Sequence, residues 1–337
     1  MGQRLLIIIS QSGTKRICPT LEKCFAGKDY ALHYEVFQGE CSQGQIDRLA
    51  ASAKEHGCTA VVGIGGGKIL DTAKAVAHDT SLPVVIVPTV ASTDSPCSSL
   101  SVIYRDNGEF ERYLFLNTCP NMVLVDTAVI AKAPVSLLVA GMGDAMATWF
   151  EARACRASGS DNQTAGKPTR AATGLAAMCW EYLQRDGAQA KRDLEAGKCT
   201  EAVETIVEVN TYLSSVGFES GGLAADHAIQ KGFTFIPQLH ALYHGNKLAF
   251  CTLAQLMLEK APQDEVDAVL QFCCDVGLPV CFADMDYPQV DHALLRLAAE
   301  KACVSGSTIH NMPFPVTADM VYDALLAADA AGTKYRQ

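Results

Sequence analysis

Short apolar runs alternate with amphipathic segments along the first 134 residues. Residues 5–9 form one continuous run of leucine and isoleucine, as expected for a strand that is buried on both faces of a parallel sheet. Further short runs that contain β-branched or aromatic residues also predict strands. They lie at residues 33–37, 60–64, 84–87 and 122–125.

Helical periodicity separates several of these predicted strands. Ser42 is placed to cap a helix over residues 43–56 that ends at Gly57, and a second helix is predicted over 70–78. A strand at 102–104 and the turn sequence Asp-Asn-Gly that follows it predict a hairpin. Because strands and helices alternate, we expect residues 1–134 to form a parallel α/β domain.

The pattern changes after Pro134. Long segments rich in alanine and leucine, with apolar spacings of three and four, predict helices. They lie at residues 136–155, 170–183, 199–215 and 247–259. We expect glycine-rich breaks at 141–143 and 217–222. Few β-branched clusters remain, so residues 135–337 predict an all-helical domain.

Composition narrows the class of protein. The 337 residues suffice for two domains, and 49% hydrophobic against 19% charged residues excludes a disordered chain. The net charge of −10, with no basic stripe, argues against a nucleic-acid partner. No apolar run approaches the ~20 residues that span a bilayer, so no membrane partner is expected.

The cysteines indicate a reducing compartment. All 14 are scattered along the chain, no CxxC pair occurs, and the apolar run at 5–9 is too short for a secretory signal. A disulfide framework is therefore not expected, and the cysteines are interpreted as small buried apolar residues. We expect a cytoplasmic protein.

A glycine-rich loop occupies residues 63–68, between a predicted strand and a predicted helix. Glycines there let the backbone approach a pyrophosphate, and a helix N-terminus supplies N–H donors. Lys68 stands where the usual GxGxxG fingerprint has its third glycine, and the spacing does not fit a Walker A loop. A tight strand–helix turn without a ligand is the alternative.

A second polar segment, residues 88–96, follows the predicted strand at 84–87. Ligands bind at the carboxyl ends of strands in open α/β sheets. The hydroxyl groups of this segment suit phosphate or ribose oxygens, and Asp94 suits the hydroxyl groups of a substrate. An Asx or Ser/Thr turn without a ligand explains the composition equally well.

Histidines and one aspartate are candidate metal ligands. Three of the eight histidines, His227, His240 and His244, fall in one stretch, and the last two would share a face if they lay on one helix. Asp144 lies between small residues in an apolar segment, where an unpaired charge is costly, so it predicts a helix cap or a metal ligand. Histidines packed in a core remain the alternative.

Together these segments resemble a known family. The matching stretches are residues 39–43, 63–68, 70–75, 88–89, 91–94, 143–145, 148–155, 214–225, 243–245 and 308–313. In them the chain is similar to the bacterial glycerol dehydrogenases, which are metal-dependent polyol dehydrogenases of the iron-containing alcohol dehydrogenase-like group. The resemblance extends from about residue 4 to the C-terminus.

The resemblance implies a dehydroquinate synthase-like fold, with a cofactor cleft between an α/β domain and a helical domain. Its zinc ligands fall on Asp144, His227 and His244, and its substrate-binding residue falls on Asp94. Its NAD contacts fall on Gly66, Gly67, Lys68, Asp71, Thr89, Ser92, Ser98, Leu100 and Tyr104. His240 is not a ligand in this pattern and is expected either to support a ligand through a hydrogen bond or to pack.

The activity implied by the resemblance is the zinc-dependent oxidation of glycerol and related vicinal diols to dihydroxyacetone, with hydride transfer to NAD+. Members of the family are homo-oligomers, often octamers. Two alternatives are a catalytically weakened or non-enzymatic paralogue and a dehydroquinate synthase-like lyase. The lyase would need several Arg or Lys contacts to an anionic substrate, and the segments around Asp94, Asp144 and His244 lack them.

The chain departs from the family pattern at several places. Ser10 stands where an aspartate normally grips the adenosine ribose, with Lys15 and Arg16 close by, so NADP use is also possible. Set against the family pattern, this sequence is expected to begin after an opening segment that normally adds an edge strand. Differences beside the metal ligands are expected to affect metal binding. They are Asp226, Gln230, Lys231 and Asn246.

Overall fold

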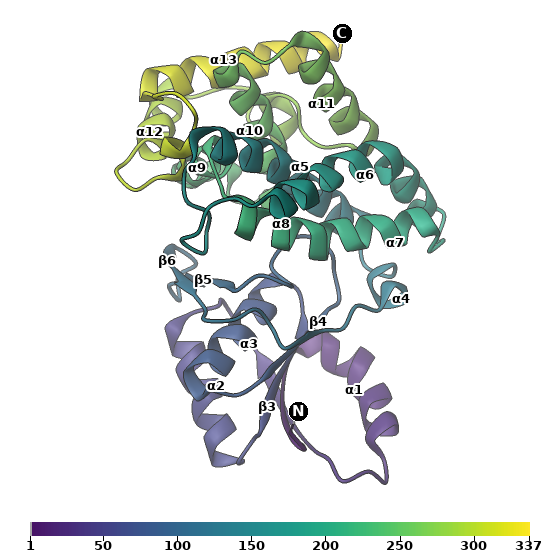
Figure 1. Ribbon diagram of the computed structural model, residues 1–337. Helices are drawn as coiled ribbons and strands as arrows, with labels where there is room; N and C mark the ends of the chain where they lie inside the picture. The colour runs from purple at the N-terminus through teal and green to yellow at the C-terminus, as the bar shows by residue number, and fades with distance from the viewer. Residues whose placement is uncertain (1) are drawn as a thin grey trace. The chain divides into compact units, whose positions relative to one another are not determined.

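A computed structural model describes residues 2–337, which divide into two compact units (Figure 1). The first unit holds the chain up to Ala91 together with Ser95–Ala133. The second holds Ser92–Asp94 and Pro134–Gln337. Among the residues described, no helix is both long enough and apolar enough to span a bilayer.

A parallel sheet of five strands in the order β2-β1-β3-β4-β7 forms the centre of the first unit. The strands are β1 (Arg4–Ser10), β2 (Ala31–Phe37), β3 (Ala60–Gly65), β4 (Val84–Pro88) and β7 (Met122–Val123). Successive side chains of a strand point to opposite faces, so β1 supplies two cores. The predicted parallel α/β domain is confirmed.

Helices cover both faces of this sheet (Figure 1). Leu6 and Ile8 pack in the core formed with α2 (Gln43–Glu55) and α3 (Gly67–Thr80). Ile7 and Ile9 lie in the core that includes Cys18 of α1 (Gln11–Phe25). The short α4 (Thr127–Ile130) is the last element of this unit along the chain. The predicted cap is confirmed, since the Ser42 side chain accepts a hydrogen bond from the N–H of Gln45.

The predicted hairpin is also confirmed. β5 (Leu100–Tyr104) and β6 (Phe110–Phe115) pair antiparallel in a separate two-stranded sheet. Gly108 in the turn has a φ of +87°, a left-handed conformation that glycine adopts without strain. This hairpin directly follows the polar segment at 88–96 in the chain.

The described part of the second unit contains helices joined by loops and no strand, as predicted. Its helices are α5 (Val135–Ser158), α6 (Arg170–Glu195), α7 (Glu201–Glu208), α8 (Ser214–Gly221), α9 (Ala225–Gly232), α10 (His244–Glu259), α11 (Gln263–Val276), α12 (His292–Ala302) and α13 (Ala318–Tyr335). A π-helical turn, Val209–Leu213, joins α7 to α8. Short 3-10 turns lie at Phe233–Phe235, Pro237–Leu239, Phe282–Met285 and Thr308–Asn311.

One predicted break in this unit is wrong. Helix α5 runs without interruption through residues 141–143. A Cβ atom on Gly143 would lie 2.3 Å from the carbonyl oxygen of Gly245, and one on Gly245 would lie 1.7 Å from that of Ala140. These glycines therefore allow the backbones of α5 and α10 to approach closely. The second predicted break is confirmed at Gly222, which follows α8 with a φ of +96°.

Candidate functional site

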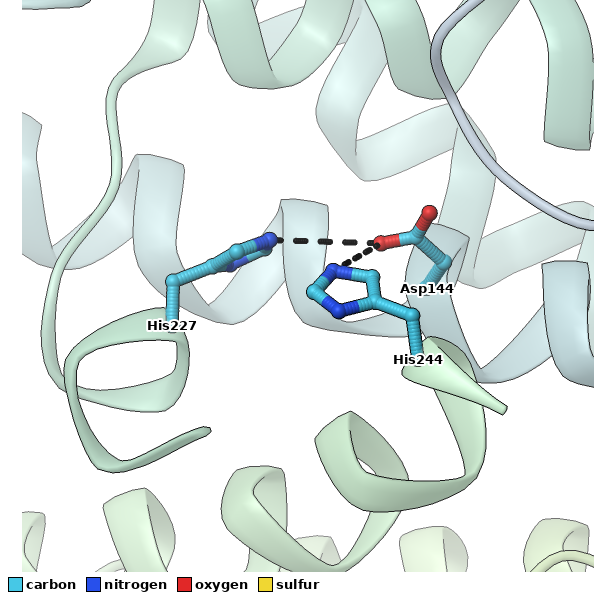
Figure 2. A group of neighbouring side chains, drawn as sticks. All are labelled: Asp144, His227 and His244. Carbon is cyan, nitrogen blue, oxygen red and sulfur yellow. Dashed lines mark ion pairs between the residues drawn. The ribbon is translucent and has the colours of Figure 1, made fainter. Parts of the chain in front are cut away.

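Three side chains that are distant in sequence converge in the helical unit (Figure 2). Asp144 lies in the middle of α5, His227 in the first turn of α9, and His244 at the start of α10. One ligand atom from each lies within 4.8 Å of the others. Both Nε2 atoms approach the same carboxylate oxygen, Oδ1 of Asp144, at 4.0 Å from His227 and 3.7 Å from His244. The predicted ligand set therefore forms one cluster.

The hydrogen bonding of Asp144 leaves a place for a cation. Its side chain is 1% exposed, and its Oδ2 atom accepts the N–H of Asp94 at 3.1 Å. Its Oδ1 atom has no hydrogen-bond partner among the residues described. Burying a carboxylate oxygen without a partner is costly, and burial raises the pKa of Asp144 to about 7.

The two imidazoles complete a donor set that fits a metal ion. Burial lowers the pKa of His244 well below its usual value, so its ring is neutral and offers a lone pair. Two histidine nitrogens and one carboxylate oxygen form one of the protein ligand sets that hold catalytic zinc. Donors bound to one tetrahedral zinc ion lie about 3.4 Å apart, so the observed separations require only small shifts.

Glu151 supports this cluster, although it is not among the site residues predicted from the sequence. It is fully buried on α5, and its Oε2 atom lies 2.5 Å from Nδ1 of His227. Burial lowers the pKa of His227, but the Glu151 carboxylate outweighs that effect and raises the pKa above its usual value. The available signal was a second acid seven residues after Asp144, on the same face of an apolar helix.

Asp94 lies beside the cluster. Its backbone N–H donates to Asp144, and its carbonyl oxygen accepts a hydrogen bond from the Ser215 hydroxyl. The segment Ser92–Asp94 belongs to the helical unit, although it follows β4 in the chain. The residue predicted to bind substrate is thus held next to a predicted metal ligand.

His240 is not part of this cluster. It follows a 3-10 turn, whereas α10 begins only at His244, so the two histidines do not share a helix. The condition under which their four-residue spacing would place both on one helix face is therefore not met. The Nε2 atom of His240 donates instead to the carbonyl oxygen of Thr234 at 2.8 Å.

Of the residues that depart from the family pattern beside the predicted ligands, Asp226 and Gln230 are buried, whereas Lys231 and Asn246 are partly exposed. Asp226 is fully buried, its Oδ2 atom accepts from Thr252, and its Oδ1 atom has no partner in the described part of the chain. Burial, followed by the charge of Glu151, raises the pKa of Asp226 well above its usual value. Burial lowers the pKa of Lys231. Oδ1 of Asn246 is likewise buried without a partner among the described residues.

The first unit presents a separate polar edge at the carboxyl ends of its parallel strands. Strand order reverses between β1 and β3, and ligands bind at such switch points. β1 ends at Ser10, and β3 ends at Gly65, whose carbonyl oxygen accepts the N–H of Thr89. Helix α3 starts next to them at Gly67, and its N-cap residue Gly66 has no side chain to cap it. Its N–H donors suit an anion such as a pyrophosphate.

Lys68 and Asp71 follow in α3 but have different surroundings. The Lys68 side chain is 58% exposed, and its Nζ atom lies 2.5 Å from Oε1 of Glu40. Asp71 is buried, and its carboxylate accepts hydrogen bonds from the Ser95 hydroxyl at 2.7 Å and the Val102 N–H at 3.0 Å. Both Asp71 oxygens therefore hold the chain on either side of the start of β5.

A buried lysine ties the same segment to α3. Lys74 Nζ lies 3.0 Å from Oδ1 of Asp71 and donates to the carbonyl oxygens of Ser95, Ser98 and Leu100. The structure thus brings three predicted cofactor contacts, Asp71, Ser98 and Leu100, into one cluster. Tyr104 lies at the other end of β5, and burial raises the pKa of its hydroxyl.

Comparison with known proteins places the chain in a family. Residues 1–127 match the family of iron-containing alcohol dehydrogenases. The whole chain is 53% identical to a glycerol dehydrogenase of Escherichia coli, over 337 residues that make up 100% of this chain and 90% of that protein.

Solved structures agree with this placement. A probable glycerol dehydrogenase of Sinorhizobium meliloti is 42% identical with a TM-score of 0.92, over 98% of this chain and 92% of that chain. A glycerol dehydrogenase of Schizosaccharomyces pombe is 34% identical with a TM-score of 0.95, over 99% of this chain and 84% of that chain. This chain therefore belongs to the glycerol dehydrogenases within the iron-containing alcohol dehydrogenase family.

Proposed function

We propose that the protein is a zinc-dependent polyol dehydrogenase that interconverts glycerol and dihydroxyacetone with NAD+ as the hydride acceptor. The observation that carries the proposal is the buried oxygen of Asp144, which lacks a partner among the described residues and faces two imidazole nitrogens. The 53% identity to a glycerol dehydrogenase of Escherichia coli supports the substrate class.

The metal would be held by Oδ1 of Asp144 and by Nε2 of both His227 and His244. A bound zinc ion supplies a Lewis acid that lowers the pKa of a substrate hydroxyl group. The same donors also suit iron(II), so a metal assay must measure both elements. Asp94, anchored through its backbone to Asp144 and Ser215, would accept a hydrogen bond from a substrate hydroxyl and orient the polyol.

The overall reaction balances without another reactant. Bound NAD+ would supply the hydride acceptor, so oxidation of glycerol would transfer one hydride from its carbinol carbon to the nicotinamide and release the hydroxyl proton to solvent. The products are dihydroxyacetone, NADH and one proton. The N-terminal unit would hold the pyrophosphate of the cofactor at the start of α3, where Gly66 and Gly67 leave the backbone accessible.

The first test is a metal-loaded turnover assay. Purified protein is incubated with zinc or iron(II), its metal content is measured, and NADH absorbance is followed with glycerol, 1,2-propanediol and dihydroxyacetone. We expect stoichiometric metal and turnover in both directions, with loss of both in Asp144→Asn. A chain that binds no metal after zinc addition would contradict the proposal. Stoichiometric metal without turnover would favour the weakened paralogue.

Cofactor choice is a second point that we propose to test. Ser10 ends β1 and places no charge there, and its Oγ atom accepts the N–H of Gly13 at 3.0 Å. A neutral residue at this position would not repel a 2′-phosphate, and the Arg16 guanidinium donates to the neighbouring Ser12 hydroxyl. We expect measurable kcat/KM with both NAD+ and NADP+, and a shift toward NAD+ in Ser10→Asp. A strong NAD+ preference in the unaltered protein would exclude relaxed choice.

We also propose a cytoplasmic homo-oligomer. All 14 cysteines are free, which suits a reducing compartment. Apolar side chains such as Phe115 and Leu124 are more than half exposed, at 53% and 55%, and would be covered by another copy. Light scattering on the purified protein measures the oligomeric state, and the mass of eight chains is the expected result.

A further inference from the structure

Glu151 makes three contacts with one neighbouring segment, all from within the core of the helical unit. It is 0% exposed and lies on α5, seven residues after Asp144. Its Oε2 atom lies 2.5 Å from Nδ1 of His227. Its Oε1 atom accepts the backbone N–H groups of Ala224 at 2.7 Å and of His227 at 3.1 Å. Both carboxylate oxygens are therefore used at the start of α9.

We propose that Glu151 is a positioning residue that presents His227 to the metal through Nε2; the inference rests on the metal site proposed above. A carboxylate accepts hydrogen bonds, so the short contact requires the proton of a neutral imidazole to be on Nδ1. Nε2 then carries the lone pair, and this atom is the one that approaches Oδ1 of Asp144. Metal-bound histidines commonly donate their other ring nitrogen to a carboxylate in this way.

The same carboxylate also fixes the backbone from which the imidazole projects. Helix α9 begins after Ala224, which has no polar side chain to cap it. Oε1 of Glu151 takes over that role by accepting two N–H groups at this end of the helix. Because α5 carries both Glu151 and Asp144, one helix sets the positions of two metal ligands relative to each other.

A glutamine at this position could not make all three hydrogen bonds of the glutamate. Its amide offers one acceptor and one donor group, whereas Glu151 faces donors on both oxygens. If the amide oxygen caps α9, the NH2 group faces Nδ1 and favours the tautomer with the proton on Nε2. If the amide oxygen faces Nδ1, the NH2 group opposes two backbone N–H groups. Either arrangement disturbs His227 as a ligand.

The chain offers a matched control for a purely structural role. Gln255 on α10 is also 0% exposed, and its Oε1 atom accepts the N–H of Asp226 at 3.0 Å. Gln255→Met removes the buried side-chain oxygen that accepts a backbone N–H at the same end of α9, together with the amide hydrogen bonds to Phe150 and Glu259. It removes no atom of the Glu151–His227 contact. Glu151→Asp keeps a carboxylate and serves as the conservative variant.

The experiment measures metal binding rather than turnover. Zinc dissociation constants of the unaltered protein, Glu151→Gln, Glu151→Asp and Gln255→Met are obtained by competition with a chromophoric chelator at one pH. Visible spectra of the cobalt-substituted proteins report the ligand set, and melting of the metal-free proteins reports the fold. We expect Glu151→Gln to bind zinc about 10–100-fold more weakly with an altered cobalt spectrum, and Glu151→Asp to bind with intermediate affinity. Gln255→Met should bind as the unaltered protein does.

Two results would overturn the inference. One is an unchanged zinc affinity and cobalt spectrum in Glu151→Gln. The other is an equal loss of affinity in Gln255→Met, which would make the effect one of helix stability. If Glu151→Gln does not fold, the comparison of Glu151→Asp with Gln255→Met decides in the same way. Failure of the unaltered protein to bind zinc would instead contradict the proposed function, so the two failures are distinguishable.

Discussion

The carboxylates of Asp144, Glu151 and Asp226 interact within the helical unit, and their protonation depends on what else is bound there. Asp144, Glu151 and Asp226 are all 0–1% exposed. Glu151 contributes to the raised pKa of both other acids, after burial itself. Without a cation the cluster favours the neutral forms of Asp144 and Asp226. A metal ion that bound these residues would therefore have to compete with protons.

Zinc affinity should consequently rise with pH across neutrality. The pKa of Asp144 is raised to about 7, so below that pH the metal must displace a proton from the carboxyl group. His227, whose pKa is also raised, adds a second proton to the competition. We expect competition titrations to give a zinc affinity that increases at least tenfold, or by about 1.4 kcal/mol, between pH 6 and pH 8. An affinity that does not change over this range would contradict the assignment of Asp144 as a ligand.

Asp226 permits a separate prediction on stability. Its pKa is higher in the folded than in the unfolded chain, so the folded state binds more protons between the two values, and its stability falls as pH rises through that window. Asp226→Asn removes this ionisation with little change in volume. We expect the metal-free variant to be about 1–3 kcal/mol more stable than the unaltered protein at pH 8, with a smaller difference at pH 5. Urea unfolding at both pH values measures the difference, and equal stabilities at pH 8 would show that the buried oxygen has a partner.

The residues proposed as metal ligands could be identified from the sequence, but the contacts that support them could not. The resemblance to a family indicated Asp144, His227 and His244, whereas histidine spacing alone did not distinguish His240 from His244 as a candidate. Glu151 contacts His227 across 76 residues of sequence, and no local pattern encodes such a contact. The sequence shows only that a second acid, Glu151, lies on the same face of α5 as Asp144, and this does not identify its partner.

Among the helices, glycine has two structural roles that the sequence does not distinguish: it ends a helix, or it allows two helices to pack closely. At Gly222 it ends a helix in a left-handed conformation, as predicted. At Gly143 and Gly245 it allows two helices to approach within backbone contact. Whether a glycine ends a helix or lies at a helix crossing depends on the presence of a partner helix, and that helix is distant in sequence. Helix α1 was missed because it is largely polar, contains Pro19, and buries only Gly13 and Cys18.

The α5–α10 crossing should be intolerant of a single methyl group. In Gly245→Ala the new Cβ atom would lie 1.7 Å from the carbonyl oxygen of Ala140, so the helices must separate. His244 is the adjacent residue, and the separation would move a ligand. We expect a loss of about 1–3 kcal/mol in the free energy of unfolding and weaker zinc binding.

Gly174 in α6 provides the control for this substitution, because a Cβ atom there meets nothing within 4 Å. Gly174→Ala should stabilise the protein by about 0.4–1 kcal/mol through helix propensity and chain entropy. Denaturant unfolding of both variants measures the contrast. If Gly245→Ala were as stable as Gly174→Ala, the glycine would not be required by the crossing.

The link between α3 and β5 depends on Lys74. Lys74→Met leaves the Asp71 carboxylate buried without its cation and leaves three carbonyl oxygens without their shared donor. We expect a loss of about 3–5 kcal/mol, as for other buried pairs that lose one partner. Lys68→Met breaks the exposed pair with Glu40 and should cost no more than about 1 kcal/mol. Comparable losses in urea unfolding of the two variants would contradict the central role of Lys74.

At the scale of the whole molecule, the two kinds of candidate site fall on different units. The glycine-rich loop at the start of α3 belongs to the first unit. The cluster of predicted metal ligands, Asp144, His227 and His244, belongs to the helical unit. The chain does not divide at a single point, because Ser92–Asp94 is part of the helical unit while the residues on either side belong to the first. Asp94 is thereby held by its own unit next to Asp144.

This division predicts that each ligand stabilises its own unit. A ligand that binds only the folded state stabilises it by about 2.7 kcal/mol at a concentration of one hundred times its Kd, which corresponds to about hundredfold slower amide exchange by unfolding. Zinc should therefore slow exchange in α5, α9 and α10, the helices that carry the three ligands. NAD+ should slow exchange around Gly66 and Thr89, at the ends of β3 and β4.

Hydrogen exchange followed by mass spectrometry resolves these segments separately. Asp144→Asn is the matched control, since it removes one metal ligand from α5 and leaves the glycine-rich loop unchanged. In that variant we expect zinc to give no protection in α9 and α10 and NAD+ to protect the first unit as before. Zinc protection that reached β1 and β3 as strongly as α10 would mean that the two units unfold together. Protection by NAD+ that disappeared in Asp144→Asn would place the cofactor contacts on the helical unit and contradict their assignment to the sheet.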